Sequence, residues 1–439
     1  MRVSFRRHAF ASVSSVVLQT RNILVIALIA CFEIPRAPVN AAAGDWLQWG
    51  GPNRNFTSDT TGLATTWPTG GPRKLWSRPL GEGHSAIVVE AGRLYTMYRP
   101  PFVAGRRSQE EVVAAIDGAT GKTIWEFKYP ASTSGVDFSE GAGPHATPLI
   151  AGNKIFAASS RRELFALDKM TGKLAWSHDF IKEYRAPSPG RGYSCSPLLY
   201  NGTIVVTVGG TNQAVMAFNP DTGVPVWKGG SIDYAPASPI VIDVDGQPQL
   251  VVFGADRIAG MNPANGQTLW SHPHKTDWGL NISTPLWSGG DHLLFLSSAY
   301  GTGSRALELR QSAGKTTVSE KWASSRMRVH ISTVIRVGDY VYGSSGDFGT
   351  TFLTAINLKT GAVAWQDRAF TRSQLLYADG KLVVLDEDGM LGLATVSPQG
   401  IKVLTRARVL DHVAWTPPTL SGKTIFVRDR RTIAAFDLS

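Results

Sequence analysis

The stretch "AIDGATGKTIW", residues 115–125, decides the fold because the chain repeats it. The same pattern returns as "ALDKMTGKLAW" at 166–176, where the second Trp, Trp176, follows the first by 51 residues. Looser copies end at Trp227, Trp270, Trp322 and Trp365, with steps of 51, 43, 52 and 43 residues. A repeat of this length is typical of a four-stranded propeller blade and too long for most helical hairpins.

The segments between these tryptophans also repeat. Each has a small polar start, a short β-rich run, a Gly or Asn turn and a second run, as in "ATPLIAGNKIFAAS" and "CSPLLYNGTIVVTV". Such runs with Gly, Asn and Asp between them are typical of β-hairpins, and eight of them occur. The sequence therefore predicts an all-β chain, an eight-bladed β-propeller of four-stranded antiparallel blades.

The two ends of the repeat array complement each other. The chain stops at 432–439, a third strand with no Trp strand after it, whereas 72–80 contains a Trp strand with nothing before it. We expect the N-terminal strand to close the last blade, because closure removes an exposed strand edge. The predicted parts are an export signal at 1–43, an N-terminal extension packing on the propeller at 44–71, and the propeller at 72–439.

The repeated motif has a structural interpretation. Thr-Gly or Asn-Gly supplies the positive φ of a tight turn, and Asp117 or Asp168 can bond the amides of its own turn. A tryptophan on the outer strand reaches toward the next blade, where burial of its large indole would hold two blades together. The alternative is a ligand contact. The residues expected to dock in this way are Trp76, Trp125, Trp176, Trp227, Trp270, Trp322 and Trp365.

The pattern A-x-D-x-x-T-G-K-x-x-W, with "DWLQWGGPNRNFTS" before the repeats, resembles the PQQ-binding-like β-propeller repeat family from about residue 45 to the end. That family contains calcium- and quinone-dependent alcohol and glucose dehydrogenases, and a noncatalytic barrel-assembly lipoprotein of the outer membrane. The dehydrogenases typically carry a disulfide between adjacent cysteines against the cofactor. This chain has two cysteines, Cys31 and Cys195, which are not adjacent, so it resembles the assembly lipoprotein more.

The first 43 residues are expected to direct export. They hold a basic start, an apolar run at 23–30 that is too short to span a bilayer, and a small-residue site for cleavage after Ala43. The alternatives are lipidation of Cys31 in "LIAC" and an uncleaved anchor. We expect a periplasmic or extracytoplasmic monomer, attached to a membrane only if Cys31 carries a lipid. The chain's net charge of +10 falls to +6 without this segment, too little and too scattered to predict nucleic-acid binding.

Signals for catalysis and metal binding are weak. Cys195 in "YSCSPLL" is expected to be a small buried residue, because no histidine is fixed beside it. The segment "DVDG" lacks the later ligands of a calcium loop and is interpreted as a hairpin turn. His272 and His274 flank a proline and are interpreted as a surface pair. No catalytic residue, metal ligand or cofactor is predicted, with PQQ and calcium as the alternative.

A ligand of a propeller binds where the inner strands begin, because each blade delivers side chains to the axis there. The candidate ligand-binding residues just before each inner strand are His84, His145, Tyr193, Tyr234, Asn281, His330, Arg372 and Trp415. Such polar and aromatic groups suit recognition, although they could also serve only to satisfy backbone groups. We expect binding to be pH-sensitive near 6.5 through the histidines, and Arg372 to favour an anionic group.

Two functions remain. The first is an exported noncatalytic propeller, a binding or assembly scaffold of the bacterial cell envelope whose funnel holds an envelope protein, a peptide or a glycan. The alternative is a PQQ- and calcium-dependent oxidoreductase of the alcohol or sugar dehydrogenase type. The residues before the inner strands supply almost no carboxylates for calcium, which favours the scaffold. The basic loop 99–111 is expected to be a solvated loop or a partner contact.

Overall fold

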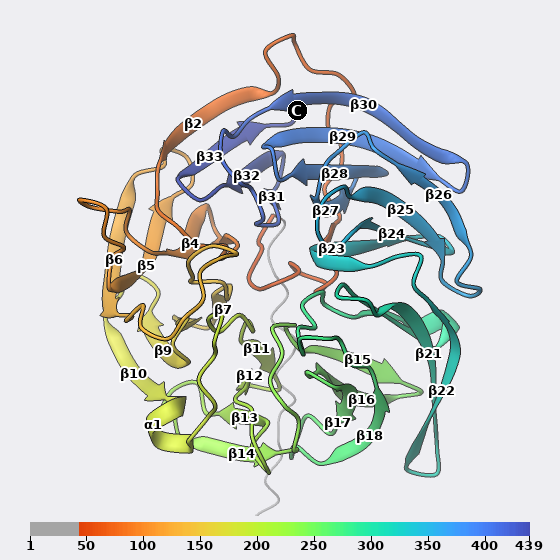
Figure 1. The fold of residues 1–439 in the computed structure, drawn as a ribbon. Helices are drawn as coiled ribbons and strands as arrows, with labels where there is room; N and C mark the ends of the chain where they lie inside the picture. Colours follow the sequence, from red (N-terminus) through yellow and green to blue (C-terminus); the bar gives the residue numbers. More distant parts are fainter. Residues whose placement is uncertain (1–43) are drawn as a thin grey trace, which may run out of the picture. The chain divides into compact units, whose positions relative to one another are not determined.

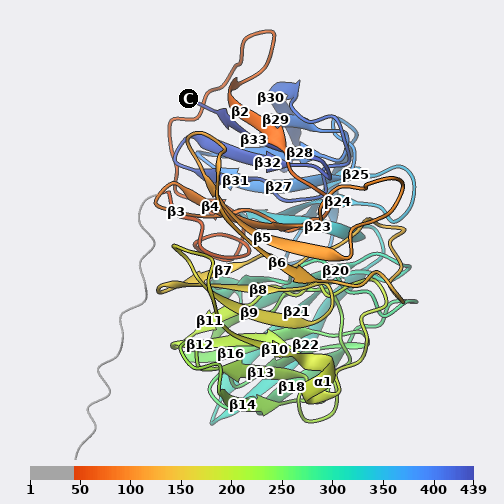
Figure 2. The same ribbon diagram turned by 90° about the vertical axis from the view of Figure 1, so that its left-hand side faces the viewer.

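The computed structural model describes residues 44–439, which form eight sheets arranged as a ring around an axis (Figure 1). Each sheet contains a blade of four antiparallel strands, from an inner strand at the axis to an outer strand at the rim, and one sheet gains a fifth strand from the N-terminal segment. The predicted eight-bladed propeller is therefore confirmed. Figure 2 shows the ring from the side, with the sheets of successive blades lying face to face.

The first four blades follow one another in the chain. Their strands are β3 (Val88–Glu90), β4 (Arg93–Tyr98), β5 (Glu110–Asp117) and β6 (Thr123–Pro130); β7 (Leu149–Ala151), β8 (Lys154–Ala158), β9 (Glu163–Asp168) and β10 (Leu174–Asp179); β11 (Leu198–Tyr200), β12 (Thr203–Thr207), β13 (Val215–Phe218) and β14 (Pro225–Gly229); β15 (Ile240–Val244), β16 (Gln247–Phe253), β17 (Arg257–Met261) and β18 (Thr268–Pro273).

The last four blades complete the ring. Their strands are β19 (Leu286–Ser288), β20 (Leu293–Ser298), β21 (Gly303–Ser312) and β22 (Lys315–Ser324); β23 (Val329–Val337), β24 (Tyr340–Ser345), β25 (Phe352–Asn357) and β26 (Val363–Asp367); β27 (Ser373–Ala378), β28 (Lys381–Asp386), β29 (Met390–Ser397) and β30 (Gly400–Arg408); β31 (Thr419–Ser421), β32 (Thr424–Arg428), β33 (Thr432–Asp437) and β2 (Arg73–Pro79).

The eighth blade is closed by the N-terminal strand, as the sequence predicts. Strand β2 pairs antiparallel with β33, and Trp76 lies opposite Ala435 while Ser77 lies opposite Ala434. The ends of the array therefore share one sheet, so the ring cannot open there without breaking backbone hydrogen bonds.

The residues before β2 contact several blades. Trp46 forms an antiparallel bridge with Val89 of β3, and β1 (Thr57–Ser58) adds a fifth, parallel strand to β27. Farther along, the Ala64 amide donates to the Leu438 carbonyl, and Phe56 packs edge-to-face on Trp49. The predicted export signal and Cys31 lie outside the described residues.

The outer-strand tryptophans lie against turns of neighbouring blades. The indole Nε1 of Trp76 donates to the Gly118 carbonyl at 2.7 Å, and that of Trp125 donates to the Lys169 carbonyl at 3.1 Å. Trp176, Trp322 and Trp365 make the same kind of bond, to Pro220, Leu358 and Ser397. Each bond joins one blade to the turn before the outer strand of the next blade.

The glycine of the repeated Thr-Gly or Asn-Gly turn forms the surface on which the indole rests. A Cβ atom placed on Gly121, Gly172 or Gly223 would fall 2.5–2.7 Å from the ring of Trp76, Trp125 or Trp176, and Gly266 stands in the same relation to Trp227. Within the turn, Asp117 accepts from both the amide and the hydroxyl of Thr120. The repeated motif thus forms one contact between blades, in which the indole of one blade packs on the glycine turn of the next.

Trp270 departs from this arrangement. It is buried within its own blade, where Nε1 donates to Oε1 of Gln249 at 2.6 Å and the ring covers Gly260. The next blade has the long β21–β22 hairpin in place of a Thr-Gly turn. The indole therefore packs inward instead of onto a neighbour.

Helical structure is sparse. The five-residue helix α1 (Phe180–Tyr184) is capped by the Asp179 carboxylate, and η1 (Gly289–Asp291) is a single 3-10 turn. Neither of these short helices in the described part of the chain is long and apolar enough to cross a membrane.

Candidate functional site

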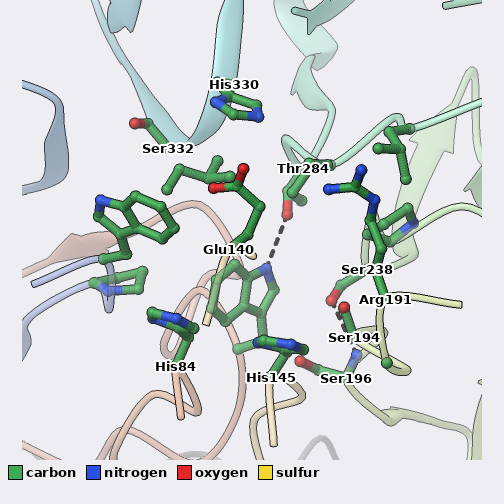
Figure 3. A pocket seen from close by; sticks show the side chains of 18 of the residues that line it. His84, Glu140, His145, Arg191, Ser194, Ser196, Ser238, Thr284, His330 and Ser332 are labelled. Atoms are coloured by element: carbon green, nitrogen blue, oxygen red, sulfur yellow. Dashed lines mark hydrogen bonds between the residues drawn. The ribbon is translucent and has the colours of Figure 1, made fainter. Parts of the chain in front are cut away.

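A cavity of about 150 Å³ lies on the propeller axis, among the residues that precede the inner strands. Four of the predicted ligand-binding residues line it: His84, His145, His330 and Trp415. Figure 3 shows the three histidines around the cavity. His84 and His145 come from the first two blades, His330 from the sixth and Trp415 from the eighth, and the ring brings all four to one place. The cavity is the candidate site.

Side-chain alternation explains which residues reach the axis. His84, His145 and Trp415 each stand four positions before the first residue of an inner strand, namely Val88, Leu149 and Thr419. Because successive side chains of an extended chain point to opposite sides, positions four and two before the strand share the axial side. The cavity accordingly also receives Ser194, Ser196, Ser238, Ile282 and Thr284.

Three predicted ligand-binding residues lie outside the cavity lining, two of them, Tyr193 and Asn281, because they are out of this register. Tyr193 and Asn281 stand five positions, and Tyr234 six, before Leu198, Leu286 and Ile240. None of them lines the cavity. The Tyr193 hydroxyl donates to the Thr207 carbonyl, the Tyr234 hydroxyl accepts from the Ser194 amide, and Asn281 bonds the Gly254 carbonyl. The bonds of Tyr234 and Asn281 join neighbouring blades, whereas the Tyr193 bond stays within its own blade.

Arg372 also lies behind the wall. It pairs with Glu387 at 3.5 Å, donates to the Asp347 carbonyl, and stacks over Trp415 with Cζ 5.7 Å from the ring centroid. Glu387 in turn accepts from Nε1 of Trp415 at 2.9 Å. Arg372 therefore supports Trp415 and does not itself reach the cavity.

Two wall residues that the motif analysis passed over are charged. Glu140 and Arg191 line the cavity from the loops before β7 and β11. Arg191 also pairs with Asp137 at 3.4 Å and covers the ring of Trp278. These loops carry no repeated pattern, so only the fold places their side chains.

One wall of the cavity is a stack of flat rings. The His84 imidazole lies parallel to that of His145, with centroids 5.4 Å apart, and its other neighbour is Trp415, also at 5.4 Å. Arg430 covers the outer face of Trp415 at 4.6 Å from the ring centroid. Offset stacking of this kind fixes the rings in place.

The histidines are held neutral. Burial, then the Arg430 charge, lowers the pKa of His145 to about 4, and burial with His145, Arg430 and Arg428 lowers the pKa of His84 well below 6.5. For His330, burial and then Arg372 and Arg191 lower the pKa to about 4. The expected pH sensitivity near 6.5 is therefore wrong for the unliganded protein, because burial and arginine charge both disfavour the imidazolium form.

The cavity also contains polar atoms without a protein partner. Ser332 and His330 are each 3% exposed, and the Ser332 hydroxyl and His330 Nδ1 have no hydrogen-bond partner. The other ring nitrogen of His330 is engaged with the Tyr300 hydroxyl at 2.5 Å. Unsatisfied buried polar groups carry a free-energy cost that a ligand or a water molecule can offset.

A calcium–quinone site does not fit these residues. Calcium takes six to eight oxygen ligands, usually with several carboxylates. Glu140 is the one acidic side chain in the cavity wall, and residues 44–439 hold no group of three His, Cys, Asp or Glu able to bind a metal ion. The one cysteine in the described region, Cys195, is fully buried, and burial raises its pKa to about 12.

The paired histidines of "SHPHK" are not a surface pair. His274 is 1% exposed, bonds the Ser298 hydroxyl at 3.0 Å and packs edge-to-face on Phe253, whereas His272 is half-buried on β18. The interpretation of both as surface residues is wrong, because the loop folds back and His274 fills a gap beside β16. The segment "DVDG" forms the β15–β16 turn, as predicted.

The ring of eight four-stranded blades, docked through tryptophans and open to a cavity at its axis, defines a propeller of the quinoprotein-like class. A family model described as "Outer membrane protein assembly factor BamB" matches residues 109–367. The chain belongs to this PQQ_2 family.

Curated relatives divide into two kinds. Outer membrane protein assembly factor BamB of Yersinia pestis is 21% identical over 371 residues, 82% of this chain and 76% of that protein. Quinoprotein alcohol dehydrogenase PedH of Pseudomonas putida is 27% identical over 166 residues, 35% of this chain. That match spans a quarter, 25%, of the dehydrogenase.

Solved structures share the fold. BamB from Moraxella catarrhalis aligns with a TM-score of 0.55 at 17% identity, covering 83% of this chain and 97% of that one. Quinohemoprotein alcohol dehydrogenase from Comamonas testosteroni aligns with a TM-score of 0.63 at 14% identity, covering 92% and 83%. Both kinds of relative are therefore built on the same ring.

Proposed function

We propose that the protein is a noncatalytic binding or assembly scaffold of the bacterial cell envelope. The observation that carries the proposal is the family match at residues 109–367, supported by an assembly-factor likeness that spans 82% of the chain. The likeness to the dehydrogenase PedH covers 35%. A scaffold needs a rigid body with several contact surfaces, and the tryptophan-docked ring supports this role.

The wall of the axial cavity supports binding more than catalysis. It combines aromatic and aliphatic surfaces with a few hydroxyls and two charged side chains, the composition of a recognition site. Its histidines are held neutral, and its single carboxylate, Glu140, cannot by itself build the calcium site of a quinone enzyme. PQQ-dependent oxidation remains the second candidate, favoured by the shared fold of the dehydrogenases.

We further propose that the protein works outside the cytoplasm, as a monomer. The basic start, the apolar run at 23–30 and the small residues before Gly44 support export. The N-terminus of the exported protein is then Gly44 or a lipidated Cys31. Mass spectrometry of the purified protein distinguishes the two, since only the second adds acyl chains at the first residue.

The test of the scaffold function is cross-linking in the host cell envelope. A photoreactive phenylalanine analogue replaces Trp278 or Phe348, which are 60% and 68% exposed beside the cavity, and Met170, 56% exposed at the β9–β10 turn, as the control position. We expect the variants with the analogue at Trp278 or Phe348 to form cross-linked adducts of defined mass with an envelope protein. These adducts should be recovered in the periplasmic fraction. Recovery of the protein in the cytoplasmic fraction, or adducts that form equally at all three positions or at none, contradicts the proposal.

A further inference from the structure

The axial cavity is closed at one end by the N-terminal segment. Trp49 lines the cavity and donates from Nε1 to the Thr284 hydroxyl at 2.8 Å (Figure 3). A second, smaller cavity lies on the other side of the Trp49 indole, between Arg54 and the Ser196–Pro197 turn. Arg54 is itself fixed by a 2.6 Å bond to the Leu199 carbonyl. The axial cavity is therefore blind, with Trp49 as its floor.

The other end opens between exposed aromatic side chains. Trp278 and Phe348, 60% and 68% exposed, each contact the Tyr300 ring, with centroids 6.1 and 5.9 Å away. Arg191 covers Trp278 at 5.2 Å from the ring centroid. Exposed aromatic rings next to a cavity are typical of a surface that contacts a ligand.

Arginines dominate the charge around the cavity. Arg191 lines it, Arg430 covers Trp415, and Arg428 and Arg372 lie behind the ring stack. Arg428 is fully buried and bonds only neutral oxygens, including the Met97 and Gly81 carbonyls. The opposing charges are Glu140 in the wall, Asp137, which pairs with Arg191, and Glu387, which pairs with Arg372.

The pKa values of the three cavity histidines depend on these charges. Besides burial, the charged side chains that act on His84 and His145 are Arg430, Arg428 and Arg99, and those that act on His330 are Arg372 and Arg191. The charges of these arginines lower the imidazole pKa, whereas the backbone groups of Glu140 and Arg191 raise the pKa of His84 and His145. The four arginines placed around the cavity, Arg191, Arg430, Arg428 and Arg372, outnumber the carboxylates of Glu140, Asp137 and Glu387, so the cavity favours an anion over an ammonium group.

The unpartnered groups suit one small anionic ligand with an apolar part. The Ser332 hydroxyl and His330 Nδ1 can each donate a hydrogen bond to a carboxylate, and Arg191 adds a charged donor. Leu280, Ile282 and Pro236 supply the apolar wall. A cavity of about 150 Å³ has room for a single residue and not for a folded element.

We propose that the axial cavity binds the C-terminal end of a polypeptide, taking the terminal carboxylate and the apolar side chain of the last residue. A blind cavity admits the end of a chain and excludes a chain that must pass through. Its excess of arginines favours the carboxylate end over the ammonium end. The aromatic rim of Trp278, Tyr300 and Phe348 then contacts the preceding residues. This assignment rests on the proposed scaffold function and specifies the part of a partner that it holds.

The first test compares peptides that differ only in their last group. Fluorescein-labelled Gly-Ser peptides ending in leucine, phenylalanine or serine are titrated with the purified protein, each as the free acid and as the C-terminal amide, and fluorescence anisotropy is recorded. We expect the leucine and phenylalanine acids to bind and their amides to bind about tenfold or more weakly, because charged hydrogen bonds are lost. Acid and amide binding equally, or no free acid binding below about 1 mM, overturns the assignment.

The second test uses charge variants with opposite expected signs. Arg191→Gln should weaken binding of the leucine acid about tenfold, and Glu140→Gln should strengthen it several-fold by removing the opposing charge. Ile331→Trp, which fills the cavity from its half-buried wall, should abolish binding. The control is Arg326→Gln, an exposed arginine outside the cavity lining, with expected affinity unchanged. Equal effects of Arg191→Gln and Arg326→Gln contradict the site.

Two further outcomes are informative. If 4-methylpentanoate, which has the leucine side chain and a carboxylate, binds while no peptide does, the cavity takes free organic acids and the peptide assignment fails. If peptides fail but the cross-links from Trp278 and Phe348 in the cell envelope are formed, the scaffold function stands and only the chain-end assignment falls. Loss of both contradicts the proposed function itself.

Discussion

Gly172 lies against the indole of Trp125, so closely that a Cβ atom on Gly172 would fall 2.5 Å from Cε3 of the tryptophan. The same turn needs a positive φ at this glycine, +73°. One residue therefore meets two requirements, a left-handed backbone and an open surface for the neighbouring blade. This double requirement explains why the chain repeats Thr-Gly and Trp together.

Replacing Gly172 should be more destabilising than the backbone conformation alone explains. Gly152 is the matched control, because its φ is +60° and nothing lies within 4 Å of its Cβ position. Gly152→Ala should lower the free energy of unfolding by about 1–2 kcal/mol, the cost of a left-handed alanine. Gly172→Ala should lower it by about 1–3 kcal/mol more through overpacking against Trp125. Equal losses in urea unfolding would show that the indole does not depend on this surface.

The tryptophans should matter for stability before they matter for any ligand. We expect Trp125→Ala to lower the free energy of unfolding by about 3–5 kcal/mol. Trp125→Phe should lower the free energy of unfolding by about 1 kcal/mol through the lost hydrogen bond to the Lys169 carbonyl. The smaller ring should lower it further through the loss of part of the packing. Trp278→Ala, at a 60% exposed rim position, should change stability by less than about 0.5 kcal/mol. A stable Trp125→Ala protein would refute the docking role.

Closure of the ring can be tested by a cross-link. Ser77 of β2 and Ala434 of β33 are register partners, so the Ser77→Cys, Ala434→Cys double variant should oxidise to a disulfide within one blade. In the chain-entropy description, closing so long a loop raises stability by up to about 5 kcal/mol. Ser77→Cys alone should show no gain. A double variant whose thiols stay free under mild oxidant contradicts the pairing of the two ends.

Acid should destabilise the protein through His274. Burial, then the charges of Arg305 and His272, lowers the pKa of this imidazole to about 3, below its ordinary value of 6.5. The unfolded chain takes up a proton below pH 6.5 and the folded protein does not. Stability from this group is therefore complete above pH 6.5 and decreases as the pH falls toward 3, by about 2 kcal/mol at pH 5.

Unfolding in urea at pH 7.5 and pH 5 measures this dependence. His274→Gln should reduce the difference between the two pH values, and His412→Gln, at an exposed residue, should leave it unchanged. An unchanged difference in His274→Gln would mean that the imidazole is charged in the folded protein.

The sequence was sufficient for the fold because all eight blades repeat the inner hairpin and seven of them carry an outer-strand tryptophan. These repeats predict the blades, and the lack of a Trp strand after 432–439 predicts the closure that β2 and β33 form. Propeller blades contact mainly their neighbours, so local patterns determine most of the architecture.

The site was predictable only in part. His84, His145 and Trp415 line the cavity and stand four positions before their strands, whereas Tyr193 and Asn281 stand an odd number of positions before theirs and do not line it. Tyr234 stands six positions before its strand and also lies outside the lining, so alternation alone does not select the wall. Counting alternation back from the inner strand would have selected Ser194 and Ile282 instead. Glu140 and Arg191 lie on loops without a repeat, and no local pattern indicates their approach to the axis.

We propose that the axial cavity is a recognition site of a noncatalytic propeller and not the centre of a quinone enzyme. The most direct measurement is calorimetric titration of the purified protein with PQQ in the presence of calcium, followed by a dye-reduction assay with alcohols and sugars. We predict no stoichiometric, calcium-dependent binding and no dye reduction, because Glu140 is the single carboxylate in the wall of the cavity. One PQQ bound per chain, with calcium-dependent reduction of the dye by an alcohol or a sugar, would contradict the account.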